Sequence, residues 1–338
     1  MKIHILFSFR EKSWGGGNQF LKTLRQEFRR TNRYAESLEY ANVILFNSHH
    51  DISRVVRLRR THSDITFLHR LDGPLGIVRG TGPTLDQAIC QANMLLADGT
   101  IFQSQWSQEA NKSIHEGITV LPYTLIPNAP DPAVFRPKSR VYDSSSPMKV
   151  IITSWSSNMR KGFSCYQFLD EHHDPRRLSI SFVGNSPIKF KKIKMSPPVD
   201  SKSIAERLRQ HDTYLTASQT DPCSNSLLEA LHCGLPAVAR DDGGHPELIG
   251  GSGVLFRDDF EVIDALEVLR RNYDGYSSKI SVGSISEVAD AYCNFASLVQ
   301  NRRTSKSSIS LWDASKLLLQ LEHSYKRKIL SLLDLIAP

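Results

Sequence analysis

Short apolar runs alternate with helical patterns along the chain, and this alternation constrains the fold more than any other feature. In the first part of the sequence the apolar runs at 3–7, 43–46, 65–68 and 99–103 read as buried strands. Between the first two runs, apolar residues recur at helical spacing from Phe20 to Phe28. Strands that alternate with helices in this way predict a parallel sheet covered by helices on both faces.

A polar stretch bracketed by prolines, 137–147, interrupts this pattern and predicts a linker. The pattern then restarts, with strands expected at 149–153, 178–183, 213–217 and 236–239 and helices expected at 163–172 and about 225–233. We therefore expect an α/β fold of two doubly wound, Rossmann-like domains, 1–140 and 147–305. A cleft between two such domains is the default place for a ligand.

The end of the chain carries one long amphipathic pattern, 312–336, with apolar residues at intervals of three or four and a basic patch at 326–328. Its one-sided apolar stripe predicts a helix that packs against a core. We expect this helix to return to the N-terminal domain.

Charge and cysteine content narrow the class of protein. The chain of 338 residues has 42 Lys and Arg against 35 Asp and Glu, a net charge of +7, which suits an anionic partner. The five cysteines are scattered without C-x-x-C spacing, which predicts neither a zinc site nor a disulfide framework. No apolar run approaches the roughly 18 residues that a membrane span needs. These features predict a cytoplasmic protein with at most peripheral membrane contact, through basic residues of the first helix such as Arg25, Arg29 and Arg30. The alternative is that these residues form a solvated basic face.

A glycine turn, Gly15-Gly16-Gly17, stands between the first strand and the first helix. Glycine lets a backbone approach a ligand closely, and a helix N-terminus favours an anion. Gly16 and Gly17 are therefore candidate donor-binding residues. The turn is neither a G-x-G-x-x-G fingerprint nor a P-loop, and the alternative is a flexible turn with no ligand.

The stretch from Asp221 to Pro236 is the most informative part of the sequence. A polar turn leads into a helix, and the backbone N–H groups at Asn225 and Ser226 would point toward a bound phosphate. Two carboxylates, Asp221 and Glu229, could grip sugar and ribose hydroxyls. The alternative is that Asp221 caps the helix, that Glu229 is an ordinary helical residue, and that both have structural roles only.

The C-terminal half resembles the retaining glycosyltransferases of family 4, which have the GT-B fold. Asp221 and Glu229 match the family's two acidic residues with seven residues between them, and Ala230-Leu231 through Gly234-Leu235-Pro236 matches the continuation. Weaker matches occur in the family's order, at 97–104, 126–137, 160–162, 183–185 and 243–247.

The resemblance implies a chemistry. Such enzymes move a sugar from a nucleotide diphosphate sugar to an acceptor hydroxyl and retain the anomeric configuration. It implies that Lys161 and Arg160 face the leaving diphosphate, where fixed cations stabilise developing negative charge. It also implies that Glu229 binds the ribose hydroxyls and Asp221 the donor sugar, both as ionised acceptors.

Two further positions come from the same resemblance. Gly184 matches the family's glycine turn after the second strand of this domain, and His69 stands where the family often places a histidine near the donor sugar. His69 could equally be a hydrogen-bonded structural histidine. Asp72 is a weaker candidate for the cleft, because Asp-Gly is also a turn signal.

The chain departs from the family at one charged position. The family usually carries an Arg about five residues before the Lys, and Ser156 stands there. Arg160 could take over the role of that Arg. No D-x-D run or metal-ligand spacing is present, so we expect neither a metal nor any other cofactor, the nucleotide sugar being a substrate.

The sequence therefore predicts a retaining glycosyltransferase that uses a UDP- or GDP-linked sugar and a saccharide or lipid-linked acceptor, in cell-surface polysaccharide or glycan synthesis. Two alternatives remain open: a nucleotide-sugar epimerase of the same architecture, and a catalytically silent GT-B module that binds a glycan. A nucleic-acid partner is suggested by charge alone, because the basic residues are dispersed and lack an aromatic-interleaved motif.

Overall fold

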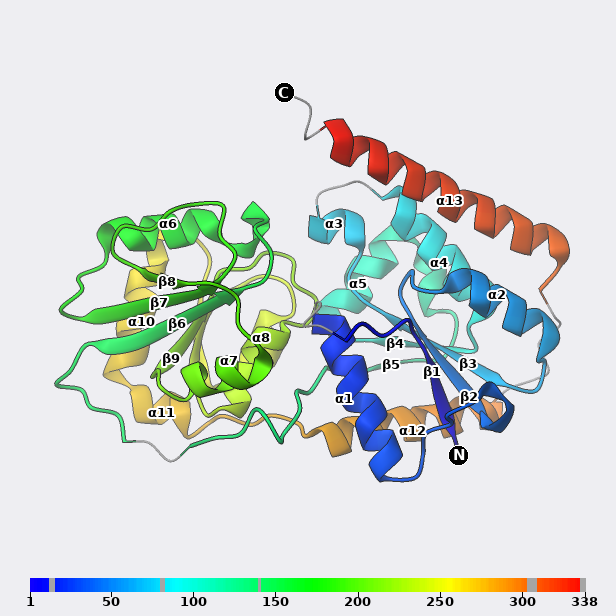
Figure 1. Cartoon of the computed structure of the whole chain (residues 1–338), viewed down its shortest axis with the longest axis horizontal. Helices are drawn as coiled ribbons and strands as arrows, with labels where there is room; N and C mark the ends of the chain where they lie inside the picture. The colour runs from blue at the N-terminus through cyan, green and yellow to red at the C-terminus, as the bar shows by residue number, and fades with distance from the viewer. Residues whose placement is uncertain (12–15, 80–82, 139–140, 303–308, 335–338) are drawn as a thin grey trace. The chain divides into compact units, whose positions relative to one another are not determined.

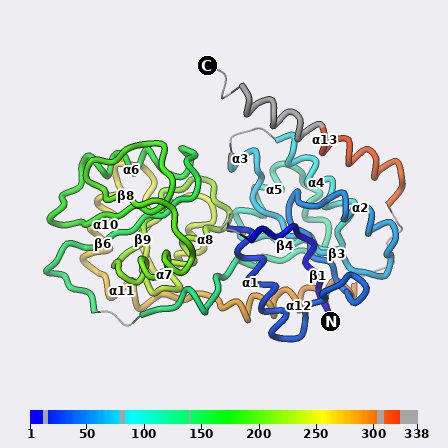
Figure 2. The backbone as a smooth tube through the Cα atoms, viewed as in Figure 1, coloured from blue at the N-terminus to red at the C-terminus, as the bar shows by residue number. Residues whose placement is uncertain are grey.

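The computed structural model describes residues 1–11, 16–79, 83–138, 141–302 and 309–334. The chain divides into two compact units (Figures 1 and 2). The first unit contains residues 1–9, 24–127 and 286–338, and the second contains residues 10–23 and 128–285. Each unit is built on one parallel sheet, as the alternation of strands and helices predicts.

The first unit has a five-stranded sheet whose strands follow one another in sequence order. The strands are β1 (Ile3–Leu6), β2 (Val43–Asn47), β3 (Thr66–Leu71), β4 (Gly99–Phe102) and β5 (Tyr123–Leu125). Its α-helices are α2 (Ile52–Thr61), α3 (Leu75–Arg79), α4 (Thr84–Leu96), α5 (Gln105–Ile114) and α13 (Leu311–Asp334). It also contains the part of α1 (Gly16–Arg30) from Leu24 onward and all but the first residue of α12 (Ile285–Arg302). The short 3-10 helices η1 (Leu38–Tyr40) and η2 (Glu116–Thr119) lie in its loops.

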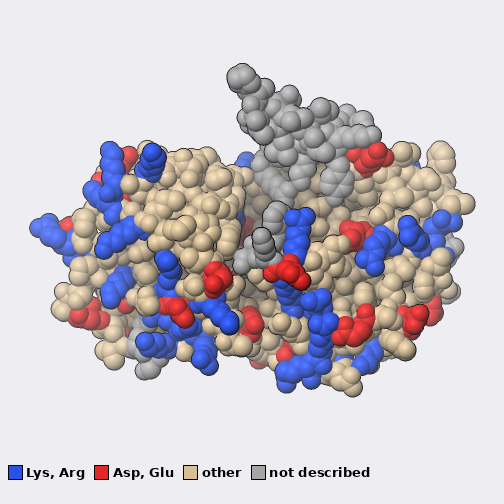
Figure 3. All heavy atoms as spheres, viewed as in Figure 1, with Lys and Arg blue, Asp and Glu red and all other residues tan. Residues whose placement is uncertain are grey.

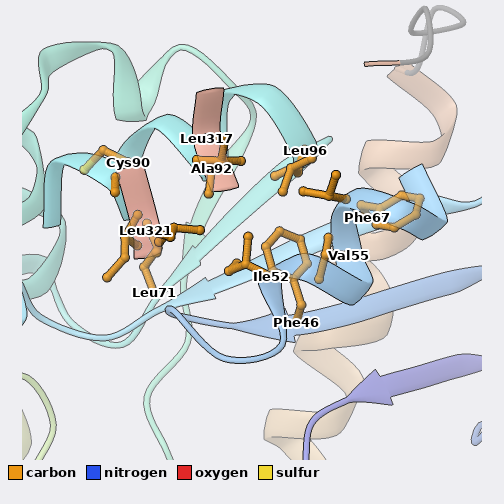
Figure 4. Close-up of a cluster of buried hydrophobic side chains, with 14 of the residues drawn as sticks. Phe46, Ile52, Val55, Phe67, Leu71, Cys90, Ala92, Leu96, Leu317 and Leu321 are labelled. Atoms are coloured by element: carbon orange, nitrogen blue, oxygen red, sulfur yellow. The ribbon is translucent and has the colours of Figure 1, made fainter. Parts of the chain in front are cut away.

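The core of the first unit joins segments far apart in the chain. Residues of β2, β3, α2 and α4 pack with Leu317 and Leu321 of α13 in one buried cluster, which Figure 4 shows in close-up. On the other face of the sheet, α12 lies so close to β4 that a Cβ on Gly99 would meet Val299 and Phe295. The sheet is therefore covered on both sides, in part by the two last helices of the chain.

The second unit has a six-stranded parallel sheet in the order β11-β10-β9-β6-β7-β8. These strands are β6 (Met148–Ser154), β7 (Leu178–Gly184), β8 (Lys194–Ser196), β9 (Thr213–Thr216), β10 (Ala237–Arg240) and β11 (Gly253–Phe256). Its helices are α6 (Phe163–His172), α7 (Ser201–Leu208), α8 (Asn225–His232), α9 (His245–Ile249), α10 (Val262–Arg271) and α11 (Tyr273–Ser277), with 3-10 turns η3 (Met159–Lys161) and η4 (Asp259–Glu261).

Strand β6 shows why this sheet must be buried on both faces. Successive side chains of a strand point to opposite faces, and an all-parallel sheet has both faces covered. Val150 and Ile152 pack into the cluster formed with α6 and α10, whereas Ile151 packs into the cluster formed with α7 and α8. All three are fully buried, which accounts for the continuous apolar run in the sequence.

The unit boundaries differ from the ranges expected from the sequence. The second unit begins at Asn128 rather than at 147, because Phe135 is buried in its core with residues of α7 and α8. The chain returns to the first unit at Ser286 rather than after 305, because α12 packs on the first sheet and Arg33 forms an ion pair with Asp290. Residues 335 and 336 of the expected last helix lie outside the described residues.

The buried face of α13 leads to a stability prediction. Leu317 is fully buried, whereas Leu319 on the same helix is 66% exposed. We expect Leu317→Ala to lower the free energy of unfolding by about 2–5 kcal/mol, because it removes buried apolar surface and leaves a cavity. Leu319→Ala should change it by no more than about 0.5 kcal/mol. Urea denaturation of the two variants measures the difference, and equal losses would show that α13 does not contribute to this core.

Candidate functional site

The strand order of the second sheet reverses next to β6, and that reversal positions the candidate site. From β6 the chain continues outward through β7 and β8, whereas β9 lies on the other side of β6. Loops that leave the carboxyl ends of β6 and β9 therefore diverge to opposite sides. In open parallel sheets, ligands bind in the crevice at such a switch point. The first sheet, with its strands in sequence order, has no such reversal among the described strands.

An ion pair joins the two loops at this switch point. Lys161, at the end of the loop after β6, places its Nζ 3.0 Å from Asp221 Oδ2 in the loop after β9. Lys161 Nζ also donates to Ser218 Oγ at 3.3 Å, and Ser218 Oγ lies 3.4 Å from the same carboxylate oxygen. The Lys161 side chain is 36% exposed and the Asp221 side chain 15% exposed, so the pair can still be reached from solvent.

Hydrogen bonds and one close backbone approach position the Lys161 loop. Asn158 caps the 3-10 turn by accepting the Arg160 N–H, and the Gln219 N–H donates to the Arg160 carbonyl at 2.8 Å. Gly162 follows with φ of +93°, where a Cβ would lie 2.5 Å from that of Ala217. Only glycine allows this backbone conformation and this close approach of the two loops.

The environment of Asp221 keeps its carboxyl ionised. Burial acts to raise the pKa of Asp221, but the positive charges of Lys161 and His245 overcome it, so the pKa lies below its ordinary value. The turn at Gly243 and Gly244 fixes the backbone of the same residue, because the Gly244 N–H donates to the Asp221 carbonyl at 2.9 Å. A Cβ on Gly243 would collide with that carbonyl.

His245 is a site residue that the sequence analysis did not single out. Its ring is fully buried, and Nδ1 lies 3.1 Å from the Arg240 carbonyl oxygen. Its Nε2 has no hydrogen-bond partner among the described residues. Burial lowers the pKa of His245, while the Asp221 carboxylate acts to raise it. The Gly-Gly turn before His245 was the available signal, because such a turn brings the residue after it against the neighbouring loop.

Glu229 lies on α8, and its electrostatic environment shifts the pKa in the opposite direction to that of Asp221. It is partly buried, and no hydrogen-bond or ion-pair partner is found for its carboxyl in the part of the chain that the structure describes. Burial raises the pKa of Glu229 to about 8. Burial therefore favours the protonated form of Glu229. The role as an ionised acceptor, which the resemblance implies, stays a prediction.

Three of the expected donor-binding residues, Asn225, Ser226 and Gly16, lie at or against the N-terminus of α8. Ser224 caps the helix by accepting the Leu227 N–H, and Asn225 and Ser226 form its first turn. Asn128 Nδ2 donates to Asn225 Oδ1 at 3.0 Å. Gly16 lies against the same turn, since a Cβ there would be 2.0 Å from Asn225 Nδ2, whereas nothing lies within 4 Å of one on Gly17.

Gly184 ends β7 beside β6 with φ of +139°. A Cβ on Gly184 would lie only 1.8 Å from the Ser154 carbonyl oxygen, so the position requires glycine for structural reasons. The next residue, Asn185, donates its side-chain amide to the Trp155 carbonyl at 2.8 Å and so ties this turn to the Lys161 loop. Gly184 thus shapes the crevice without being shown to contact a ligand.

His69 belongs to the first unit and lies within strand β3, fully buried. Its Nε2 lies 2.9 Å from the Ser48 carbonyl oxygen, its Nδ1 lies 3.1 Å from Asn93 Nδ2, and its ring stacks on Phe46. Burial lowers the pKa of His69 to about 4. Both ring nitrogens are engaged within the core, which favours the alternative of a structural histidine, and we leave His69 out of the proposed mechanism.

Two other expected residues, Arg160 and Asp72, differ in their surroundings. Arg160 is exposed on the loop after β6, and Ser156 Oγ accepts the Asn158 N–H within the same loop. Asp72, in the first unit, forms an ion pair at 2.8 Å with the fully buried Arg70. Neither arrangement demonstrates a role in ligand binding.

The arginines expected to contact a membrane are engaged within the first unit. Arg29 forms an ion pair with Glu36 and Arg30 one with Glu27, each at 2.7 Å. The guanidinium of Arg25 stacks over the ring of Phe9, 3.9 Å from its centroid. Their charges are therefore largely compensated or covered by protein.

In the described ranges, no group of three or more His, Cys, Asp or Glu side chains could hold a metal ion. None of the helices among those residues is both long and apolar enough to cross a membrane.

Comparisons with protein families and with solved structures identify proteins that this chain resembles. Residues 173–272 match the family described as glycosyl transferases group 1, a segment of the second unit that includes Asp221 and Glu229. No curated protein sequence matches the chain significantly.

Solved structures match the whole chain. Sucrose-phosphate synthase from Thermosynechococcus elongatus is 14% identical with a TM-score of 0.64, and the match covers 98% of this chain and 100% of that one. Anabaena HepE in complex with UDP is 16% identical with a TM-score of 0.63, and the match covers 96% and 100%. The fold is that of the GT-B glycosyltransferases. This confirms the fold class expected from the sequence.

The pKa of Glu229 yields a prediction about stability and pH. Because its pKa rises from 4.5 to about 8 on folding, the folded protein keeps a proton that the unfolded chain releases within this window. Stability should therefore fall as the pH rises from about 4.5 to about 8. We expect Glu229→Gln to flatten this fall, measured by thermal denaturation across the window, while the exposed Glu171→Gln leaves it unchanged. Parallel profiles for Glu229→Gln and the wild type would contradict the proposed environment.

Proposed function

We propose that this protein is a retaining glycosyltransferase that moves a sugar from a nucleoside diphosphate sugar to a hydroxyl of a saccharide or lipid-linked acceptor. The observation that carries the proposal is the Lys161–Asp221 pair at the switch point of the second sheet. The family match covers this region, and related solved structures include Anabaena HepE in complex with UDP-glucose. Cell-surface polysaccharide or glycan synthesis is the pathway class proposed.

Lys161 has the central electrostatic role in this mechanism. During transfer the bond between the sugar C1 and the diphosphate oxygen breaks, and a bond between C1 and the acceptor oxygen forms on the same face, while the proton of the acceptor hydroxyl passes to the departing diphosphate. Negative charge collects on the departing diphosphate. An ammonium already fixed at the crevice stabilises that charge without reorganising. In the free protein, Asp221 and Ser218 hold Lys161 in position.

The remaining residues have binding roles in the proposal. Asp221, ionised, accepts hydrogen bonds from hydroxyls of the donor sugar. Glu229 binds the ribose hydroxyls, and a protonated carboxyl can both donate to one hydroxyl and accept from the other. The N–H groups at the start of α8 add a positive dipole toward phosphate, and Arg160 is available to add a second cation.

Substitutions in the loop after β6 test the role of Lys161. We expect Lys161→Ala to lower turnover at least a hundredfold, because one fixed donor aimed at developing charge contributes about 3–4 kcal/mol. Ser156→Ala, which removes a neutral hydrogen bond worth about 1 kcal/mol, is the matched control. Release of UDP or GDP from the sugar nucleotide measures turnover.

The same assay separates two roles for Arg160. If Arg160 replaces the Arg absent at Ser156, Arg160→Ala should approach the Lys161→Ala loss, and Arg160→Lys should recover only part of it, because lysine lacks the planar fork. A correctly folded and fully active Lys161→Ala variant would contradict the proposal.

Catalysis should survive chelation. Fixed cations can do the electrostatic work that a divalent metal does elsewhere, so we expect turnover to be unchanged in excess EDTA. The check compares initial rates with and without EDTA, and then after Mg²⁺ is restored. Complete loss that Mg²⁺ reverses would show that the reaction needs a metal.

A further inference from the structure

The ring of His245, at the start of α9, has one nitrogen engaged and one without a partner. Its Nδ1 lies 3.1 Å from the Arg240 carbonyl oxygen. A carbonyl oxygen only accepts hydrogen bonds, so Nδ1 donates and carries the hydrogen of the uncharged ring. Nε2 is then a bare lone pair, fully buried and without a hydrogen-bond partner among the described residues. A buried acceptor left unbonded costs free energy, and this one is a position where a proton can bind.

Arg240 fixes the ring in this orientation. Its guanidinium donates to the Ala217 carbonyl at 3.2 Å and to the Arg257 carbonyl at 2.6 Å, and it forms an ion pair with Asp259. Its own carbonyl, at the end of β10, is the acceptor for Nδ1. The ring therefore keeps its Nδ1 hydrogen bond, and any change in its protonation takes place at Nε2.

Three charged groups from three loops act on this ring. Asp221 belongs to the loop after β9, Lys161 to the loop after β6, and Asp242 to the loop after β10 that also leads into His245. The Thr220 N–H donates to Asp242 Oδ2 at 3.1 Å and so ties two of these loops together. Strand β11, which also packs on α9, carries no titratable side chain. Two carboxylates and one ammonium thus compete to set the charge of the ring.

In the free protein this competition favours the uncharged ring. Burial lowers the pKa of His245 and the Lys161 charge adds to that effect, while Asp221 and Asp242 act to raise the pKa. An anion bound at Lys161 would neutralise the one cation that acts against protonation. The two carboxylates would remain, and the pKa of His245 would rise.

Charges on the outside of the molecule have a weaker effect on this ring. On the face shown in Figure 3, Lys and Arg side chains are interspersed with Asp and Glu. Exposed charges are screened by salt over about 10 Å, whereas buried groups are screened much less. The charge state at Lys161 is therefore the variable to which the buried ring responds most.

We propose that His245 is the second cation of this site: when the diphosphate of a nucleotide sugar binds Lys161, His245 takes up a proton at Nε2 and holds Asp221 ionised and in place. The proton comes from solvent, an Nε2–H bond forms, and the Nδ1 hydrogen bond to Arg240 is kept. His245 acts through Asp221 and is a positioning residue. The inference rests on the proposed function, because it needs a diphosphate at Lys161.

Calorimetric titration of the full chain with UDP tests the proposal. If binding takes up a proton, affinity falls as the pH rises, by up to about tenfold per pH unit for one proton. We expect the rise in Kd between about pH 6.5 and about pH 8 to be at least fivefold larger in the wild type than in His245→Asn. The Asn side chain can still donate to the Arg240 carbonyl but cannot titrate. Titrations in buffers of different ionisation enthalpy should show more protons taken up per UDP in the wild type.

Two control variants separate this effect from other titrating groups. His172, exposed on α6, also has Nδ1 close to a carbonyl oxygen, that of Phe168 at 2.8 Å. His172→Asn should therefore keep the pH dependence of the wild type. Combining His245→Asn with Glu229→Gln should remove as much proton uptake, relative to Glu229→Gln alone, as His245→Asn removes from the wild type.

Two further measurements keep the test decisive. Where circular dichroism shows that His245→Asn is unfolded, His245→Gln takes its place. Nitrogen NMR of the histidine rings in the wild type needs no variant, and it should show one ring gaining a proton at Nε2 when UDP is added. Equal pH dependence in the wild type and His245→Asn, or no change in any ring, would overturn the inference while UDP binding leaves the proposed function standing. If neither UDP nor GDP binds, both are overturned.

Discussion

The second unit's site depends on one ion pair, between Lys161 and Asp221, that bridges two loops leaving the sheet in opposite directions. Neither loop alone would hold Lys161 in place. Gly162 allows the close approach to Ala217, and the Gly243-Gly244 turn supports Asp221 from the other side. The cation is therefore positioned by the topology of the sheet, through backbone contacts that only glycine tolerates, before any ligand is present.

The sequence predicts the buried strands well because burial on both faces leaves a continuous apolar run. The expected strand at 149–153 is one residue shorter than β6 at each end, and the expected strand at 178–183 is one residue shorter than β7 at its C-terminal end. Three strands were missed, β5, β8 and β11, whose residues are mostly half-buried or exposed and leave no such run. Their pairing is fixed by neighbouring strands, which a linear pattern does not contain.

The site residues show more clearly what the sequence does not predict. The motif spacing identifies Asp221 and Glu229 equally as candidate binding residues, and both were expected to be ionised. The fold then places one carboxyl beside Lys161 and the other among groups that offer it no charged partner, which moves their pKa values in opposite directions. For His69, the position in the motif order likewise says nothing of Ser48 and Asn93, which engage both ring nitrogens from distant parts of the chain, and its role near the donor sugar stays a prediction.

This division between the two carboxyls bears on how the site would receive a diphosphate. Near neutral pH the Lys161 charge is balanced by Asp221, while the protonated Glu229 adds no negative charge. In the proposed function, an ionised Glu229 would add a second negative charge to the site and would oppose binding of the donor's diphosphate. The raised pKa of Glu229 therefore removes this opposition, so that the dipole of α8 and any contribution from Arg160 act on the proposed ligand without a second carboxylate against them.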